Sequence, residues 1–392
     1  MIIVGIDAHK QLHKALALND AGTILDQWQG PNSPEGWHSL HQWVTTFAGP
    51  RQWGIEGAWN YGRGLAQYLV AEGETVYEIN PRWTAERRRK ARKPGKSDKL
   101  DALAVAQLVR EDSSTLPQVT ADDETAILDL LVTEREGALT EATRLRNQIH
   151  QLLLQIDPEY KAHLPGLKTQ AGLRMVTSYT TTSQHALDQQ RAAVIRRTAE
   201  RLELALRQAK DLADQIRKSA QLHYTPLTQL RGVDLLTAGA LAGILGPGRR
   251  FLTDAQLAAH AGVAPLEASS AGRVRHRLNP GGNRRLNAIL YRIALTQARC
   301  CPAAQIYLAR RQSEGKTRRE AIRALKRYLV RAVWRLWQEC NPKSAHHACL
   351  KRAQVPTYEQ AAWSGAGAGG PPAPAPLQAK KAARHHSLAG GS

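Results

Sequence analysis

The chain has 392 residues, enough for two or three folded units, because a single core rarely grows beyond about 250 residues. Its 54 Lys and Arg against 34 Asp and Glu give a net charge of +20, which favours a polyanionic partner such as nucleic acid. Four cysteines argue against a disulfide framework, and no apolar run approaches the ~18 residues of a spanning helix, so we expect a cytoplasmic protein without membrane contacts.

Residues 1–112 alternate between strand and helix patterns. Three strands are expected first, at 1–7, 12–20 and 23–30, followed by a helix at 33–47 that Ser33 or one of its neighbours caps. The pattern continues with a strand at 52–57, a helix at 61–73, a strand at 74–80 and two more helical stretches to about residue 111. Three meandering strands followed by alternating helices and strands predict an α/β unit built on a mixed sheet.

Long helices are predicted between residues 121 and 222. Apolar residues recur there at alternating steps of three and four, the spacing of a coiled-coil seam. They are Ala138, Ala142, Leu145, Ile149, Leu152 and Ile156 in the first helix and Leu202, Leu206, Ala209, Ala213, Ile216 and Ala220 in the second. Pro158 and Pro165 interrupt the pattern, so the helices could pack as an antiparallel hairpin or against a second chain.

A third, mainly helical unit is predicted at about 225–345. Residues 364–392 are rich in Gly, Pro and Ala, which cannot build a core, so we expect a disordered basic tail. A zinc site is not expected, because the cysteines near the C-terminus form no CxxC pair and the adjacent Cys300 and Cys301 would point apart on a helix.

Four acids of the first unit form a candidate metal site. Asp7 closes an apolar strand, where a buried carboxylate needs a cation, and Glu56 closes a strand that can be its neighbour. Asp98 and Asp101 lie three residues apart and share one helix face. Each acid alone is most simply a turn former or a helix cap. Together they could hold one or two Mg²⁺ ions, which stabilise the attacking and leaving oxygens of a phosphodiester displacement.

A basic run follows the second of these acids and extends just past the third, with nine Lys and Arg from Arg82 to Lys99. Beside an acidic metal cleft such a run is a candidate clamp for a phosphate backbone. We expect these of its residues to bind nucleic acid: Arg87, Arg88, Arg89, Lys90, Arg92, Lys93 and Lys96. The stretch "PGKS" does not complete a nucleotide-binding loop, which requires Gly where Lys90 stands, so ATP binding is not expected.

Two sets of motifs resemble the insertion sequence one-ten family of transposases, relatives of the Piv-type DNA invertases. The first set is "GIDAHK", "IEGAWNYG", "INP" and "KSDKLDA", which resembles the RuvC-like DEDD domain of that family. The second is "LRGVDLLTAGALAGILGPGRRFLTDAQLAAHAGVAP" with "SSAGRVRHRLNPGGNRRLNAILYRIAL", which resembles its C-terminal transposase domain. The match covers roughly residues 1–112 and 227–300, in the family's order and with a helical spacer between them.

The resemblance implies a ribonuclease H-like fold for the first domain, with Asp7, Glu56, Asp98 and Asp101 as the Mg²⁺ ligands. It implies recombination of a donor and a target DNA, guided by a noncoding RNA that the element encodes and that pairs with both, at the bacterial nucleoid. It also implies a dimer or tetramer, in which the serine of one protomer meets the acids of another.

The resemblance further implies a serine nucleophile, which falls on Ser270, just before "AGRVR". Ser269 is the rival, although the spacing from Pro265 favours Ser270. A serine that attacks a phosphodiester keeps the bond energy in a phosphoserine link, so strands can be cut and rejoined without ATP. A free serine is a poor nucleophile, so the metal-bound acids would have to activate it or stabilise the departing oxygen.

Basic residues follow Ser270 closely, and residues 273–331 contain 16 Lys and Arg against two acids. We expect this region to bind nucleic-acid backbone, beginning with Arg273, Arg275, Arg277, Arg284 and Arg285. The stretch "LRGVDLLTAGALAGILG" resembles the family's helix-hairpin-helix turn, but Asp234 replaces its second Gly. We therefore expect this helix to serve packing rather than phosphate contact.

Two other functions are compatible with parts of the sequence. The first is a metal-dependent RuvC-like junction nuclease, in which water attacks the phosphodiester and Ser270 is incidental. The second is a protein that only coats nucleic acid, which the charge alone would explain but which leaves the four acids without a role.

Overall fold

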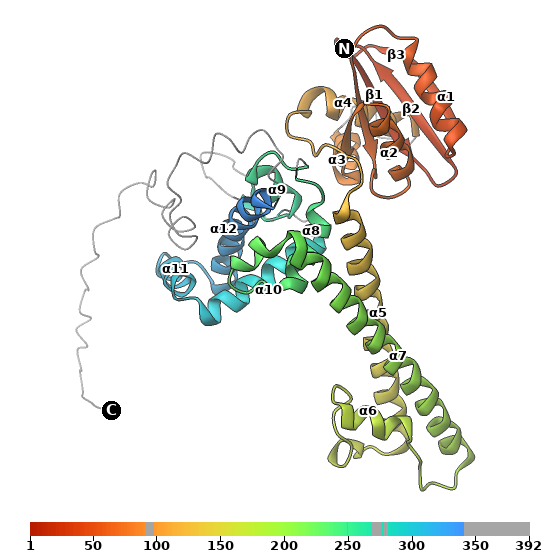
Figure 1. The fold of residues 1–392 in the computed structure, drawn as a ribbon, viewed down its shortest axis with the longest axis vertical. Coiled ribbons are helices and arrows are strands. Elements are labelled where there is room, and N and C mark those ends of the chain that lie inside the picture. Colours follow the sequence, from red (N-terminus) through yellow and green to blue (C-terminus); the bar gives the residue numbers. More distant parts are fainter. Residues whose placement is uncertain (91–97, 249, 268–275, 278, 280, 341–392) are drawn as a thin grey trace, which may run out of the picture. The chain divides into compact units, whose positions relative to one another are not determined.

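The computed structural model describes residues 1–90, 98–248, 250–267, 276–277, 279 and 281–340. The N-terminal part forms a five-stranded sheet of order β3-β2-β1-β4-β5 (Figure 1). Its strands are β1 (Ile2–Ala8), β2 (Leu12–Leu18), β3 (Ile24–Pro31), β4 (Arg51–Glu56) and β5 (Thr75–Ile79). β1, β2 and β3 form an antiparallel meander, whereas β4 and β5 continue the sheet parallel to β1. The predicted mixed α/β unit is confirmed.

Helices cover both faces of this sheet because successive side chains of a strand point to opposite faces. Ile2, Val4 and Ile6 of β1 pack in one core with α1 (Pro34–Thr45) and α2 (Arg63–Ala71). Ile3 packs in the other core with α4 (Asp98–Asp112), which follows α3 (Pro81–Lys90). The Ser33 hydroxyl accepts a hydrogen bond from the Gly36 amide and caps α1, so Ser33 itself is the cap among the residues that the sequence left open.

Two glycines let α4 lie unusually close to the sheet. A methyl group added at Gly5 would come within 2.2 Å of the Ala102 carbonyl oxygen, and one added at Gly54 within 2.5 Å of a Val109 methyl. Real side chains do not tolerate such distances, so only glycine allows this approach. At Gly5 the helix backbone therefore packs directly on the strand backbone, and at Gly54 the strand backbone lies against the side chains of Val105 and Val109.

Two long helices, α5 (Glu124–Ile156) and α7 (Ala186–His223), pack against each other, with η1 (Tyr160–Ala162) and α6 (Gln170–Thr177) at their connection (Figure 1). Their core includes Leu145 and Ile149 of α5 and Leu202 of α7, all from the predicted seam. Nε2 of His223 at the end of α7 lies 3.0 Å from the Glu124 carboxylate at the start of α5, so the two helices run antiparallel. Of the two arrangements left open by the sequence, the described chain adopts the hairpin.

The remaining described residues are mostly helical. They form η2 (Thr225–Gln229), α8 (Leu235–Leu245), α9 (Asp254–His260), β6 (Leu266–Glu267), β7 (His276–Arg277), α10 (Arg284–Cys300), α11 (Pro302–Ser313) and α12 (Arg318–Glu339). As expected, α8 serves packing: Gly239 lies against Ile216 of α7, and Gly243 against the backbone of Asp129 in α5. The Asp234 carboxylate caps this helix through the Thr237 amide at 2.8 Å.

The predicted tail at 364–392 lies outside the described residues, and the division into domains stays a prediction. Within the described ranges, no helix has both the length and the apolar character needed to cross a bilayer.

Replacing Gly5 by Ala should destabilise the protein by about 1 to 3 kcal/mol, because the new methyl group overpacks the contact with α4. Urea unfolding of wild type and variant measures the difference. Gly137→Ala is the matched control: this helical glycine has open space around it, so the change should be neutral or stabilise by up to ~1 kcal/mol. Equal midpoints for the two variants would contradict the close approach.

Candidate active site

Asp7 and Glu56 lie side by side at the carboxyl ends of β1 and β4. They are register partners on neighbouring parallel strands, so their side chains point to the same face of the sheet. That face is the one covered by α4, because Gly5 and Gly54, two residues earlier in each strand, contact this helix. The sequence prediction that the two strand ends are neighbours is confirmed.

Asp101 comes to the same face from α4. It is only 5% exposed and directly precedes Ala102, the residue whose carbonyl oxygen lies against Gly5. Asp98 begins α4, but its side chain lies outside the described residues. Within the described part, no three His, Cys, Asp or Glu side chains are grouped tightly enough to hold a metal ion as they stand. The fold therefore brings three acids to one face without forming a finished metal cage.

Asp7 is only 7% exposed, and two polar side chains, His9 and Lys14, lie on its side of the sheet. The His9 ring nitrogen Nε2 lies 3.1 Å from the Asp7 carboxylate oxygen Oδ2. Lys14 of β2 is the antiparallel register partner of Asp7, so it belongs to the same sheet face. Neither His9 nor Lys14 is predicted from the sequence as a partner of Asp7, although "GIDAHK" shows the histidine two residues beyond the acid.

The segment that contains Ser270 is flanked by a small two-stranded ribbon. β6 and β7 pair with Leu266 opposite Arg277, while residues 268–275 between them, with Ser269 and Ser270, lie outside the described residues. Below the ribbon the backbones of Gly262 and Gly282 touch, since a methyl group at Gly282 would lie 2.2 Å from the Gly262 nitrogen.

The base of this ribbon also touches the N-terminal part of the chain. The Asn80 side chain, directly after β5, donates a hydrogen bond of 3.3 Å to the Gly281 carbonyl. The residue that follows β5 and the residues that follow β7 are therefore in direct contact.

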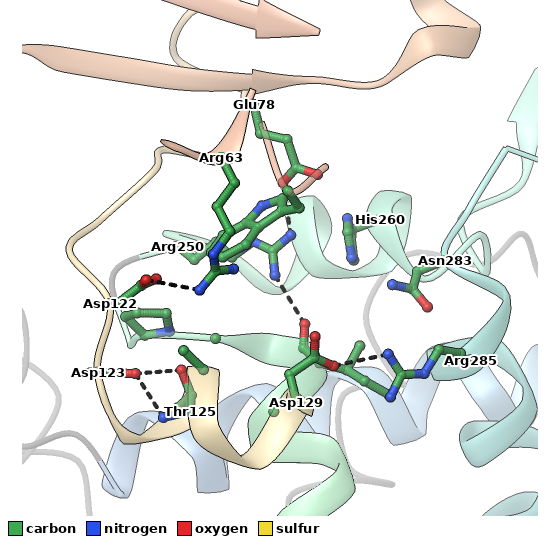
Figure 2. Close-up of a pocket in the computed structure, with 16 residues that line it drawn as sticks. Arg63, Glu78, Asp122, Asp123, Thr125, Asp129, Arg250, His260, Asn283 and Arg285 are labelled. Carbon is green, nitrogen blue, oxygen red and sulfur yellow. Dashed lines mark hydrogen bonds and ion pairs between the residues drawn. The ribbon is translucent and has the colours of Figure 1, made fainter. Parts of the chain in front are cut away.

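A buried ion pair joins the sheet to the segment after α8 (Figure 2). Arg250 is 6% exposed and donates from Nη2 to the Glu78 carboxylate of β5 at 2.7 Å. Its Nη1 donates to the Ile244 carbonyl at 3.0 Å, and its guanidinium stacks 4.7 Å from the centre of the Trp59 ring. Trp59 lies three residues after Glu56, so Arg250 contacts the loop that directly follows a candidate metal ligand.

Charges at this junction are paired. Burial alone would raise the pKa of Glu78, but Arg250 and His260 lower it below its ordinary value. Burial, with help from Arg250, lowers the pKa of His260 to about 4, so the ring is neutral at pH 7. Around the same cavity of about 240 Å³, Arg63 pairs with Asp122 at 2.8 Å, as Figure 2 shows. Because its arginines face carboxylates, the cavity is an ionic junction between chain segments.

Comparisons with known proteins bear on both halves of the chain. A family model described as Transposase, of the DEDD type of IS110, matches residues 4–158. A second model, Transposase IS116/IS110/IS902 family, matches residues 224–309. The chain belongs to the IS110/IS116 family of insertion-element transposases. Membership of this family implies an enzyme that acts on DNA.

Curated relatives agree with the family models. A 43.6 kDa protein of insertion element IS110 from Streptomyces coelicolor is 29% identical over 62% of this chain and 71% of its own length. A 42 kDa protein of insertion element IS900 from Mycobacterium paratuberculosis is 25% identical over 86% of the chain and 95% of its own length. The transposase for insertion sequence element IS1328 from Yersinia enterocolitica is 22% identical over 53% of the chain and 59% of its own length.

Some of the predicted nucleic-acid-binding residues of this transposase contact its own carboxylates. Arg87 donates to Glu111 at 2.7 Å and to Gln107 at 3.0 Å, which fastens α3 to α4. Arg285 pairs with Asp129 of α5 at 2.9 Å. Of the others, Arg277 and Arg284 are exposed, whereas these lie outside the described residues or have side chains that do: Arg88, Arg89, Lys90, Arg92, Lys93, Lys96, Arg273 and Arg275. Their contact with nucleic acid stays a prediction.

Glu78→Gln should cost about 3 to 5 kcal/mol of folding free energy, because it leaves the buried Arg250 guanidinium without its counter-charge. Urea unfolding at pH 7 measures the loss. The control is Glu141→Gln, whose pair with Arg144 is largely exposed and should change stability by less than ~1 kcal/mol.

The same pair sets a dependence on pH. Since folding lowers the pKa of Glu78, its contribution is fully present above the unfolded value of 4.5 and is lost as the pH falls through the lower folded value. Wild type should therefore lose more stability than Glu78→Gln on acidification below pH 4.5. Parallel curves for the two proteins would show that the ion pair is not formed in solution.

Proposed function

We propose that this transposase cuts and exchanges DNA strands through a phosphoserine intermediate, with its acid cluster holding divalent cations. The observation that carries the proposal is the shared face of Asp7, Glu56 and Asp101 at the carboxyl ends of two parallel strands. Acids from segments far apart in sequence have no packing reason to meet there, since each is costly to bury alone. An RNase H-like fold for this part agrees with the strand order β3-β2-β1-β4-β5.

Oxygen donors of this kind suit Mg²⁺, of which one or two ions would be held by Asp7, Glu56, Asp98 and Asp101. When bound, the metal would polarise a phosphate oxygen and stabilise the negative charge that develops on it. Strands β1 and β4 position Asp7 and Glu56, and helix α4 positions Asp98 and Asp101. His9, at 3.1 Å from Asp7, orients that carboxylate.

Ser270 is the proposed nucleophile. Its Oγ forms a bond to phosphorus while the bond from phosphorus to one strand end breaks, the hydroxyl proton leaves, and the departing oxygen takes up a proton. A hydroxyl of another strand then attacks the phosphoserine and restores a phosphodiester, so no ATP is consumed. The placement supports this role: the ribbon that flanks Ser270 meets Asn80, directly after β5 of the acid-bearing sheet.

We further propose that a noncoding RNA from the element selects donor and target sequences, which leaves the protein to recognise backbone. The charge of +20 supports such a polyanionic assembly. We propose a dimer or tetramer formed through the helical hairpin. Exposed apolar side chains on its helices support this contact, among them Leu154, Met175, Leu187 and Leu204.

Excision in a bacterial host tests the proposal. A plasmid with the gene and its native flanking DNA should yield a circular junction by PCR with wild type and with the control variants Ser313→Ala and Asp20→Asn, which alter exposed residues. Ser270→Ala and Asp7→Asn should reduce the product by about 10³-fold or more, since each removes a reacting group. Full excision by Ser270→Ala would instead support attack by Ser269 or the junction nuclease that uses water.

Metal removal tests the acid cluster separately. Cleavage of labelled element-end DNA by the purified protein with its RNA should stop on chelation with EDTA and return with Mg²⁺ or Mn²⁺. Asp101→Asn should stay inactive at any concentration of either metal, whereas the exposed-site change Asp20→Asn should behave as wild type. Cleavage that survives chelation would rule out the metal role of these acids.

A further inference from the structure

Two hydrogen bonds in series connect a buried lysine to the start of the ribbon that flanks Ser270. Lys326 of α12 is only 8% exposed, and its Nζ donates to Oδ1 of Asn287 in α10 at 2.8 Å. Nδ2 of Asn287 donates in turn to the Ala261 carbonyl at the end of α9, at 2.7 Å (helices labelled in Figure 1). We propose that Lys326, acting through Asn287, is a positioning residue for the nucleophile segment. The inference rests on the proposed function, in which Ser270 is the nucleophile.

The charge of Lys326 has no counter-charge close to it. Within the described part of the chain Lys326 pairs with no carboxylate: it donates to the Asn287 amide, and the centre of the Tyr291 ring lies 5.9 Å from Nζ. Burial lowers the pKa of Lys326, and the nearby charge of Arg323 lowers it further. An apolar side chain in this place would avoid the cost of burying a charge. The amine is therefore better explained by what its hydrogen bond orients.

The two partners of Asn287 fix the orientation of its amide. A lysine amine only donates hydrogen bonds, and a main-chain carbonyl only accepts them. One arrangement of Asn287 satisfies both, with Oδ1 toward Lys326 and Nδ2 toward Ala261. Donation from a cation also polarises the amide and strengthens its bond to the carbonyl. Without the amine, the amide is free to turn away from Ala261.

The Ala261 carbonyl lies at the foot of the ribbon, which comprises residues 261–265 before β6 and residues 281–283 after β7. Main-chain amides of the first part donate back to carbonyls of α9 at 3.0 to 3.1 Å. The second part touches the first where the backbones of Gly262 and Gly282 meet. The bond to the Ala261 carbonyl adds a tie to α10, so the foot is fixed to the helices as well as to itself.

Other side chains of α12 hold the preceding segment in a comparable way. Arg327 pairs with Asp254 at 2.8 Å, and Trp334 donates from Nε1 to the Phe251 carbonyl at 3.0 Å. These contacts fix the start of α9 and the residues before it. Lys326 extends the same row of contacts to the end of α9 and the foot.

The foot is close in sequence to the proposed nucleophile. β6 begins directly after residue 265, and Ser270 lies three residues beyond the end of β6. A shift of the foot is therefore passed to the serine over a short length of chain. Misplacing a reacting atom by about 1 Å costs about 10²-fold in rate. Lys326 acts on the reaction only through Asn287, so its role is positioning and not catalysis.

Hydrogen exchange tests the anchor without any DNA chemistry. In the full-length protein, Lys326→Met should raise the exchange rate of the amides of residues 262–264 about tenfold or more, because the foot loses its tie to α10. The matched control is Gln297→Leu: this buried amide of the same helix donates to the Arg231 carbonyl at 2.9 Å, and its loss should leave residues 262–264 unchanged. Unchanged exchange at the foot in Lys326→Met overturns the proposal. So does a rise spread evenly over α10, α11 and α12, which would mean that the lysine only supports packing.

Trapping the covalent intermediate tests the consequence for the reaction. Protein with its RNA, labelled element-end DNA and Mg²⁺ should form an adduct that resists SDS. Lys326→Met and Asn287→Leu should each form it about 10- to 100-fold more slowly, with DNA affinity within about twofold of wild type, and Gln297→Leu should keep the wild-type rate. Because both side chains act through one series of bonds, the double variant should be no slower than the slower single variant. A wild-type rate in Lys326→Met, a loss confined to DNA affinity, or additive losses overturn the proposal.

The two measurements separate this inference from the proposed function. Absence of any adduct with the wild-type protein would refute the serine nucleophile. Hydrogen exchange would still decide whether Lys326 holds the foot, because that measurement needs neither DNA nor metal.

Discussion

The close packing of α4 on the central strands is the constraint on which the candidate active site depends. Gly5 and Gly54 remove the side chains that would otherwise hold the helix away, so the helix backbone reaches the sheet. This approach places Asp101 of α4 on the face where Asp7 and Glu56 end their strands. The glycines thus help to position the candidate site without bearing any functional group.

Contact between the two halves of the chain depends on a different kind of interaction. Arg250 satisfies Glu78, a main-chain carbonyl and the Trp59 ring at once, and these groups come from segments on both sides of the helical hairpin. Such a buried pair adds little net stability over apolar packing. Any arrangement that separates the two charges is strongly destabilised, because it leaves a buried charge without a partner. It therefore specifies one docking of the later segment against the sheet, beside the loop that follows Glu56.

Features that depend on the local pattern of residues could be predicted from the sequence. Strands, the Ser33 cap and the hairpin helices follow from periodicity and capping chemistry, and the meeting of Asp7 with Glu56 follows from strand order. Contacts that depend on long-range packing were missed: Arg250 finds Glu78 across 172 residues. The two strands of the ribbon have two residues each, too few to show a periodic pattern in the sequence. The heptad pattern of a helix is the same whether its partner helix belongs to the same chain or to another, so the sequence left the hairpin open.

The helical hairpin has a consequence for how such chains can diverge. α7 contains 38 residues and extends for about 57 Å, and its seam with α5 repeats in sevens. Matched insertion or loss of one heptad in each helix would keep every core contact in phase and move the α6 end by about 10 Å. A shift of any other size would rotate the outer face of the hairpin. The length of the hairpin can therefore change in steps of one heptad, which would move its α6 end while the acid cluster stays unchanged.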